Sequence, residues 1–132
     1  MVVFDSAIFI DDLRTGCHSE RINAVRDFIR TSSVVLAELW RGATTQAEEK
    51  FLVWLENHYP LLTPTEKNWL DSGRILKRIQ DDHGFEPKKL RGLHFDVLIA
   101  LTVRTNGALL VTTNRRDFEL IRGYGDFKLE IW

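Results

Sequence analysis

Short apolar runs alternate along the chain with longer blocks in which apolar residues recur every three or four positions. The short runs are rich in β-branched and aliphatic residues and are typical of strands. They are largely apolar instead of alternating with polar residues, which indicates strands covered on both faces. We expect strands over residues 2–4, 32–36, 61–62, 108–111 and 127–132.

The longer blocks predict helices. Thr65 and Glu66, just after Pro64, are typical of a helix start, and Gly84 is typical of a helix end. The block 95–104 is apolar on nearly every side, so its helix should lie at the centre of the fold. Helices are expected over residues 22–29, 37–41, 47–58, 65–83, 95–104 and 115–122.

Residues 85–93 are predicted to form a loop, because they include Pro87, Gly92 and three basic side chains. Elsewhere strands and helices alternate, and no internal repeat interrupts them. This order predicts an α/β fold, a three-layer α/β/α sandwich around a central, mostly parallel sheet of four or five strands. In such folds ligands bind at the carboxyl ends of the strands.

The length and composition fit one globular domain, predicted to span residues 1–132. With 44% hydrophobic and 28% charged residues, the sequence is unlike a disordered or collagen-like chain. The net charge of -1 gives no general basic character for nucleic-acid binding. It is a cancellation, however: residues 1–66 carry 6 basic and 10 acidic side chains, and residues 67–132 carry 12 and 9.

Cysteine content and hydropathy favour a cytoplasmic protein. Cys17 is the only cysteine, so the chain cannot form an internal disulfide. The N-terminal segment lacks the basic region of a signal peptide. The longest uncharged run, residues 105–114, is far shorter than the roughly 20 residues that a membrane span needs. We therefore expect no contact with a membrane.

Four acidic residues are expected at the carboxyl edge of the sheet. Asp5 ends the first strand, and Glu38 follows the second. Asp96 is expected to open the central helix, and Asp117 to lie in the turn after the strand 108–111. Each residue alone could be a helix-start or surface acid. Together they predict an acidic pocket.

Carboxylates gathered in a partly buried pocket repel one another. Either some of them are protonated, with a raised pKa, or a cation neutralises them. Oxygen ligands suit a hard ion, so Mg²⁺ is favoured, with Mn²⁺ as a substitute. The single cysteine and the four histidines show no metal-ligand spacing, which argues against zinc.

The sequence resembles the PIN-domain ribonucleases, and among them the small VapC-type toxins of prokaryotic toxin–antitoxin pairs. The segments that carry the resemblance are the apolar strand ending in Asp5, the L-A-E of residues 36–38, the D-x-L-I-A of residues 96–100 and the T-x-N-x-x-D-F of residues 112–118. Together with the closing K-L-E-I-W strand they cover nearly the whole chain. The resemblance implies a PIN-like fold.

This resemblance also implies an activity, the endonucleolytic hydrolysis of RNA phosphodiester bonds that leaves 5′-phosphate and 3′-hydroxyl ends. It implies that Asp5 and Asp96 bind Mg²⁺ directly, and that Glu38 and Asp117 complete the metal and catalytic site. Residues expected to support these acids or to contact phosphate are Ser6, Thr113 and Asn114. Ser6 stands where the family often has threonine, and it retains the hydroxyl.

Basic side chains are expected to hold the RNA backbone around the acidic pocket. The candidates are Lys88, Lys89, Arg91, Arg115 and Arg116. Trp54 and Trp69 fall on apolar helical faces and are expected in the core. Trp40, close to Glu38, stays open as a base-stacking residue.

The resemblance implies protein partners as well. Toxins of this kind are usually homodimers, and a small cognate antitoxin covers the pocket and inserts a basic side chain among the acids. The apolar face of residues 51–59 could serve either contact, or it could belong to the core.

Other functions stay open at this point. A housekeeping PIN ribonuclease in RNA processing would carry the same motifs. A catalytically silent RNA-binding module is disfavoured because all four acids are present. A receiver-type phosphoacceptor switch would share the parallel sheet and could use Asp11 and Asp12, but the lysine expected after a late strand is missing from residues 111–114.

Overall fold

A sheet of five parallel strands forms the centre of the structure, a computed structural model that describes residues 1–132. The strands are β1 (Val2–Phe4), β2 (Ile29–Ser32), β3 (Leu61–Leu62), β4 (Leu109–Thr112) and β5 (Lys128–Ile131). Their order is β3-β2-β1-β4-β5, and every neighbouring pair is parallel. The predicted α/β class and parallel sheet are confirmed.

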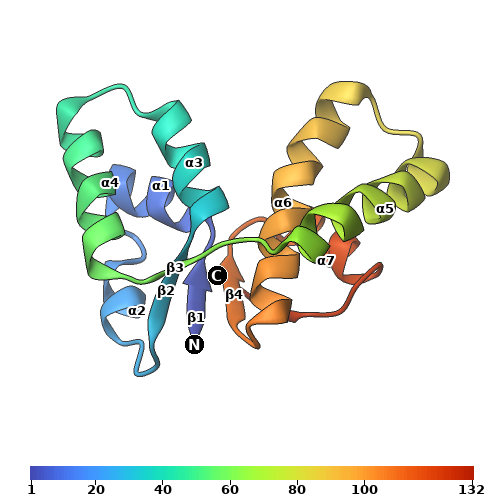
Figure 1. The fold of residues 1–132 in the computed structure, drawn as a ribbon. Coiled ribbons are helices and arrows are strands. Elements are labelled where there is room, and N and C mark those ends of the chain that lie inside the picture. Colours follow the sequence, from blue (N-terminus) through green and yellow to red (C-terminus); the bar gives the residue numbers. More distant parts are fainter.

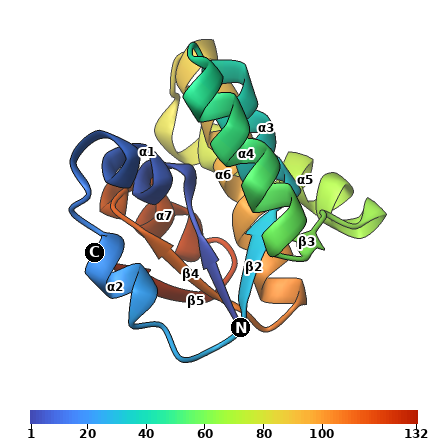
Figure 2. The same cartoon turned by 90° about the vertical axis from the view of Figure 1, so that its left-hand side faces the viewer.

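Seven helices cover the two faces of this sheet. They are α1 (Ser6–Thr15), α2 (Ser19–Asn23), α3 (Ser33–Gly42), α4 (Gln46–His58), α5 (Glu66–His83), α6 (Pro87–Thr105) and α7 (Arg115–Arg122). Figure 1 shows α1 to α4 on one side of the sheet and α5 to α7 on the other. Figure 2 shows α1 and α2 on the near side of β4 and β5. The fold therefore has the three layers predicted.

The hydrophobic core forms one cluster of 27 buried residues. Val3 and Phe4 of β1 lie at its centre, next to the buried run from Val97 to Leu101 in α6. The near-complete burial of this run confirms that the apolar block 95–104 is the central helix. Since Asp5 directly follows β1 and Asp96 lies in α6, the core fixes the position of the site.

The prediction of a strand over residues 32–36 is wrong, because β2 ends at Ser32 and α3 begins at Ser33. The Ser32 hydroxyl accepts hydrogen bonds from the N–H groups of Val34 and Val35, at 3.2 and 3.4 Å. It therefore caps the helix. This cap, together with the burial of Val34 and Val35, outweighs the preference of β-branched residues for strands.

The predicted helix over residues 22–29 is wrong from residue 24 onward. Helix α2 ends at Asn23, and Phe28 is 73% exposed. The Phe28 carbonyl accepts a hydrogen bond from the Val2 N–H at 2.8 Å, and Ile29 pairs with Val2 in the sheet. The backbone of Phe28 and Ile29 thus pairs with β1, although the apolar periodicity predicts a helix there.

The predicted loop over residues 85–93 is also wrong, because α6 begins at Pro87. A proline lacks an N–H, and the first turn of a helix has no acceptor for one, so Pro87 fits this position. Gly92 lies inside the helix, where nothing approaches within 4 Å of an added Cβ. Asp96 consequently lies in the middle of α6 and not at its start.

Helix α1 is absent from the sequence prediction. Only Ile8 and Phe9 in it are buried, so it has a weak apolar stripe. It ends at Gly16, whose φ of 68° favours glycine. Helices α4, α5 and α7 follow the predicted ranges closely. No helix combines the length and the apolar character needed to cross a membrane.

Trp54 and Trp69 are surface residues, contrary to prediction, with 42% and 51% of their area exposed. Trp54 stacks on His58, with ring centroids 4.0 Å apart. Leu52 and Leu55 supply the core face of α4 instead. The apolar block 51–59 is therefore divided between the core and the surface.

Candidate metal centre

Three of the predicted acids come together at the carboxyl edge of the sheet. Asp5 directly follows β1, Glu38 lies in α3 after the end of β2, and Asp96 lies in α6, which contacts α3. Carboxylate oxygens from the three residues lie within 4.8 Å of one another. Asp96 thus reaches the site from the middle of α6, whereas the sequence predicts it at the start of a helix.

These three carboxylates have no cationic partner, and two of their oxygens are buried without a hydrogen-bond donor. Asp5 is only 3% exposed to solvent. Its Oδ1 atom and the Oε1 atom of Glu38 are buried and accept no hydrogen bond. None of the three acids takes part in an ion pair. A buried acceptor without a donor costs about 1–3 kcal/mol, so the cluster requires protons or a cation.

The electrostatics of the cluster raise the pKa of each member. Burial, then the charge of Asp5, raises the pKa of Glu38 to about 7. Burial, then the charges of Asp5 and Glu38, raises the pKa of Asp96 to about 8. Burial also raises the pKa of Asp5, although the Thr112 hydroxyl counteracts it. At neutral pH Asp96 therefore largely retains its proton and Glu38 is about half protonated, whereas solvent-exposed acids would be ionised.

The donor set fits a hard divalent cation. All the candidate ligand atoms are carboxylate oxygens, and two of them are buried without a partner. Mg²⁺ and Mn²⁺ prefer such ligands. No histidine or cysteine belongs to the cluster, so it lacks the ligands that zinc prefers.

Asp117, the fourth predicted acid, lies beside this cluster and is held differently. It sits in the first turn of α7, after β4, and its charge contributes to the raised pKa of Asp96. Its Oδ1 atom is 2.6 Å from Nζ of Lys89, and its Oδ2 atom accepts a hydrogen bond from Nδ2 of Asn114 at 3.2 Å. Both oxygens therefore already have partners.

Thr112 connects Asp5 to this second acid and is absent from the predicted site residues. Its hydroxyl donates to Oδ2 of Asp5 at 2.8 Å and accepts from the Asn114 N–H at 3.0 Å. The side chain of the predicted Thr113 makes no hydrogen bond. Thr112 opens the T-x-N-x-x-D-F motif, which was the available indication. The Ser6 hydroxyl, as predicted, interacts with Asp5 and lowers its pKa.

We expect Thr112→Val to destabilise the protein by about 1–3 kcal/mol, because the variant removes a buried hydroxyl that has two partners. Asp5 would lose its side-chain donor, and the Asn114 N–H would lose its acceptor. Urea unfolding measures the effect. Thr113→Val is the matched control and should change stability by less than about 0.5 kcal/mol. Equal effects of the two variants would contradict the role of Thr112.

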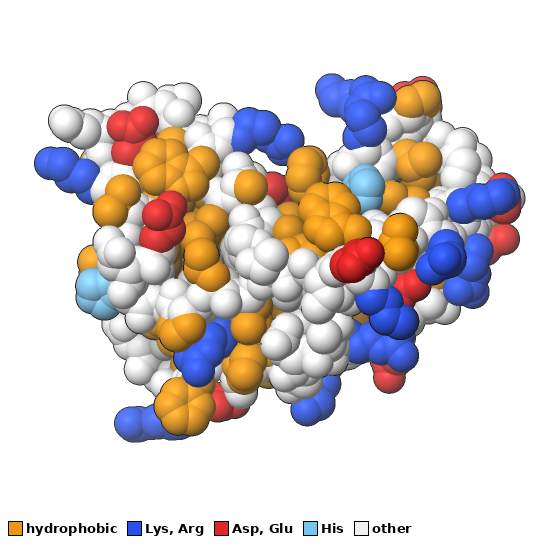
Figure 3. All heavy atoms as spheres, in the orientation of Figure 1, with side chains coloured by type: hydrophobic (Ala, Val, Ile, Leu, Met, Phe, Trp, Pro, Cys, Tyr) orange, Lys and Arg blue, Asp and Glu red, His pale blue; other side chains and the backbone are white.

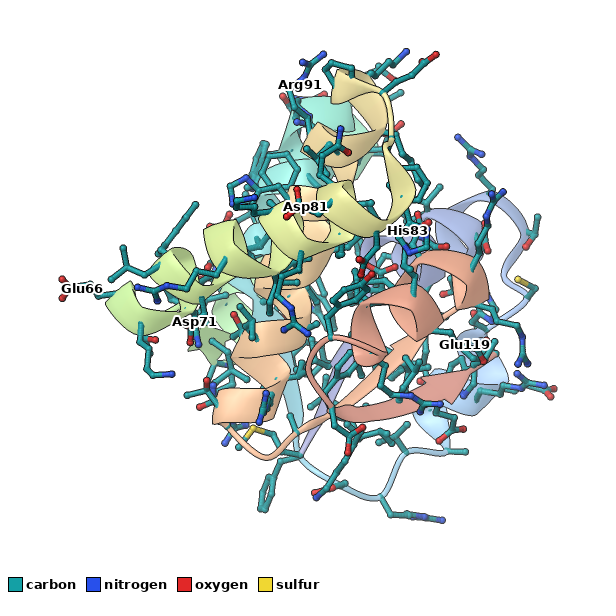
Figure 4. The ribbon with its side chains drawn as sticks, turned by 90° about the vertical axis from the view of Figure 1, so that its right-hand side faces the viewer. Glu66, Asp71, Asp81, His83, Arg91 and Glu119 are labelled. Carbon is teal, nitrogen blue, oxygen red and sulfur yellow. The ribbon has the colours of Figure 1, made fainter.

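The basic candidates near the acids differ in whether they already form an ion pair. Arg115 pairs with Glu119 at 3.0 Å, and Lys89 is held by Asp117. The exposed basic candidates without an ion pair are Lys88, Arg91 and Arg116. Arg91 lies near the amino-terminal end of α6 (Figure 4). Figure 3 shows basic side chains on both sides of the notch between α3 and α6.

Arg41 is a further basic residue at the site, one that the sequence prediction omits. It follows Glu38 by one helical turn and lowers the pKa of that carboxyl. Its guanidinium lies 5.1 Å from the ring centroid of Phe95, across the notch in α6. Trp40, left open as a base-stacking residue, instead donates its indole N–H to Glu56 at 2.7 Å.

Two cavities approach the acids from different sides. One of about 650 Å³ lies among α1, α3 and α4, and its lining includes Ile10, Leu13 and Glu38. Another of about 360 Å³ is lined by residues that include Lys88, Lys89 and Asp117. Glu38 is therefore reached from the larger, more apolar cavity, and Asp117 from the smaller cavity on the basic side.

A parallel sheet with an acidic cluster at its carboxyl edge defines a PIN-like α/β protein. Chains of solved VapBC complexes have the same fold. A chain of DNA-bound VapBC from Salmonella typhimurium matches with a TM-score of 0.70 and 24% identity, over 99% of this chain and 97% of that chain. A chain of VapBC-1 from nontypeable Haemophilus influenzae matches with a TM-score of 0.72 and 21% identity, over 100% and 98%.

VapBC2 from Rickettsia felis, bound to a DNA fragment from their promoter, contains a further such chain. Its TM-score is 0.72 at 23% identity, and the match covers 100% of this chain and 99% of that chain. No protein-family model and no curated protein matches the sequence. The likeness thus lies in the fold, and it confirms the PIN-like, VapC-type resemblance at that level.

Proposed function

We propose that the protein is a metal-dependent endoribonuclease that hydrolyses RNA phosphodiester bonds, and that it is the toxin of a type II toxin–antitoxin pair. The observation that carries the nuclease proposal is the buried group of Asp5, Glu38 and Asp96, with two carboxylate oxygens that lack any partner. The fold shared with chains of VapBC complexes supports the toxin proposal.

In this proposal Asp5, Glu38 and Asp96 hold Mg²⁺, for which Mn²⁺ can substitute. A bound ion of this kind would supply an activated water and neutralise phosphate charge. The chain itself keeps the ligands in place: Thr112 holds Oδ2 of Asp5, and the core fixes α6 with Asp96. Asp117, oriented by Asn114 and Lys89, is the acid best placed to orient a water or take up its proton.

RNA binding requires positive charge outside the acidic cluster, because the cluster repels phosphate. Arg41, Lys88, Arg91 and Arg116 are exposed and have no ion pair, so they are the proposed phosphate contacts. Lys89 and Arg115 are engaged by acids and would have to exchange partners to contact RNA. The planar Arg41 guanidinium suits a bidentate contact with phosphate.

RNA cleavage by the purified protein tests the proposed activity. The protein, freed of metal and then supplied with Mg²⁺ or Mn²⁺, should cut a pool of cellular RNA and leave 5′-phosphate ends. EDTA should stop the reaction. Cleavage that continues in EDTA, or a protein that binds Mn²⁺ and cuts no RNA, would contradict the proposal.

The toxin proposal predicts that expression of the protein alone arrests bacterial growth. A small DNA-binding antitoxin encoded beside it should restore growth and form a complex with the protein, itself proposed to be a homodimer in the cytoplasm. Growth assays with Asp96→Asn as the inactive control measure this. Harmless expression of an enzyme that is active in vitro would instead favour a housekeeping ribonuclease.

A further inference from the structure

Lys89 already neutralises one acid of the site. Its Nζ atom lies 2.6 Å from Oδ1 of Asp117, and the Asp117 side chain is only 16% exposed. The other carboxylate oxygen accepts a hydrogen bond from Asn114. The chain itself therefore satisfies both oxygens of this half-buried carboxylate.

The remaining acids present the opposite situation. Oδ1 of Asp5 and Oε1 of Glu38 are buried without a donor, and no basic side chain pairs with Asp5, Glu38 or Asp96. The acidic site thus divides into two unequal parts. Asp117 is paired with the Lys89 ammonium, whereas Asp5, Glu38 and Asp96 have no ion pair.

The Lys89 ammonium opposes a metal ion on the same oxygen of Asp117, because the two positive charges would repel each other at this distance. Mg²⁺ would coordinate a carboxylate oxygen at about 2.0–2.1 Å, and a charged ammonium cannot serve as a ligand. Lys89 lies in the first turn of α6 and Asp117 in the first turn of α7, two helices that pack together. The pair therefore joins two well-anchored elements.

We propose that Lys89 is a built-in counter-cation that reserves Asp117, so that the protein binds one divalent ion at Asp5, Glu38 and Asp96 and excludes a second ion at Asp117. This inference rests on the proposed function, because it assumes that Asp5, Glu38 and Asp96, the three acids without an ion pair, hold a metal. The cavity of about 360 Å³ beside Lys89 and Asp117 leaves room for a second ion once the ammonium is removed.

Counting bound Mn²⁺ by electron paramagnetic resonance tests this inference. Wild-type protein should bind one ion, and Lys89→Met should bind two. Lys88→Met is the matched control, because Lys88 is the adjacent lysine, is exposed and has no ion pair; it should bind one ion. Adding Asp117→Asn to Lys89→Met should return the count to one.

Two ions on the wild-type protein, or one ion on Lys89→Met, would overturn the role of Lys89. If Lys89→Met does not fold, Lys89→Gln repeats the test with a polar side chain. If the wild type cleaves RNA in a metal-dependent way but Lys89→Met binds the same number of ions as the wild type, this inference alone is overturned. Failure of the wild-type protein both to bind Mn²⁺ and to cut RNA would overturn the proposed function as well.

Discussion

Replacing Asp96 with asparagine is expected to lower kcat/KM for RNA cleavage by at least about 100-fold, because the variant removes one of three charges that would hold the ion. The amide has nearly the same size as the carboxyl group, so the core around α6 should stay packed. Cleavage assays and circular dichroism together separate loss of activity from loss of folding.

The same variant should be more stable than the wild type when metal is absent. Asp96 lies among Asp5, Glu38 and Asp117, whose charges all raise its pKa, so its replacement removes both burial cost and repulsion. The expected gain is on the order of 1–3 kcal/mol at neutral pH. Asp126→Asn is the control, since Asp126 is exposed and precedes β5 at the opposite edge of the sheet. Unchanged cleavage by Asp96→Asn would contradict the site.

The second large effect concerns pH. Without metal, the free energy of unfolding should fall as pH rises from about 4 to 8, on the order of 2–4 kcal/mol after discounting solvent screening of the partly exposed Glu38. The pKa values of Glu38 and Asp96 lie near 7 and 8 in the folded protein, above their ordinary values of 4.5 and 3.8. The folded state thus binds more protons than the unfolded state in this window.

Mn²⁺ should reverse this dependence, because the ion competes with protons for the same carboxylates. Stabilisation by Mn²⁺ should therefore be small at pH 5 and large at pH 8. Urea unfolding in EDTA and in excess Mn²⁺ measures both curves. The difference between wild type and Asp96→Asn isolates the contribution of this group. A stability that is independent of pH in EDTA, or an absent effect of Mn²⁺ at pH 8, would count against the cluster.

The hydrophobic pattern predicts the sheet and most helices. Strands buried on both faces are apolar runs, and helices with one buried face have apolar residues every three or four positions. The pattern fails where a single local interaction decides between two structures. The Ser32 hydroxyl begins α3 within a β-branched segment, and pairing of Val2 with Ile29 draws residues after α2 into the sheet. Pro87 begins a helix in a segment that otherwise has loop composition.

The acids could be predicted because three of them follow from strand ends and motif spacing. Their exact relations could not, since they depend on contacts between distant segments. Thr112 meets Asp5 across the β1–β4 pair, and Lys89 meets Asp117 across α6 and α7. Arg41 reaches Phe95 across the notch between α3 and α6. No spacing in the sequence encodes these contacts.

The surface tryptophans show a different limit of sequence reasoning. Helical periodicity places Trp54 on the same block as Leu52 and Leu55, yet only the two leucines point into the core. Helix α4 lies on the outside of the fold, so only one of its faces packs against the core. The apolar block is wider than that face, and its remaining side chains are exposed. The uncovered part leaves an aromatic surface whose occupant the sequence pattern does not specify.

We propose that Asp5, Glu38 and Asp96 together hold a divalent metal ion. Anomalous scattering from a crystal grown with Mn²⁺ tests it most directly. We expect one anomalous peak, coordinated by oxygens of these three carboxylates. A fully loaded crystal with no peak there, or with the ion bound elsewhere, would contradict it.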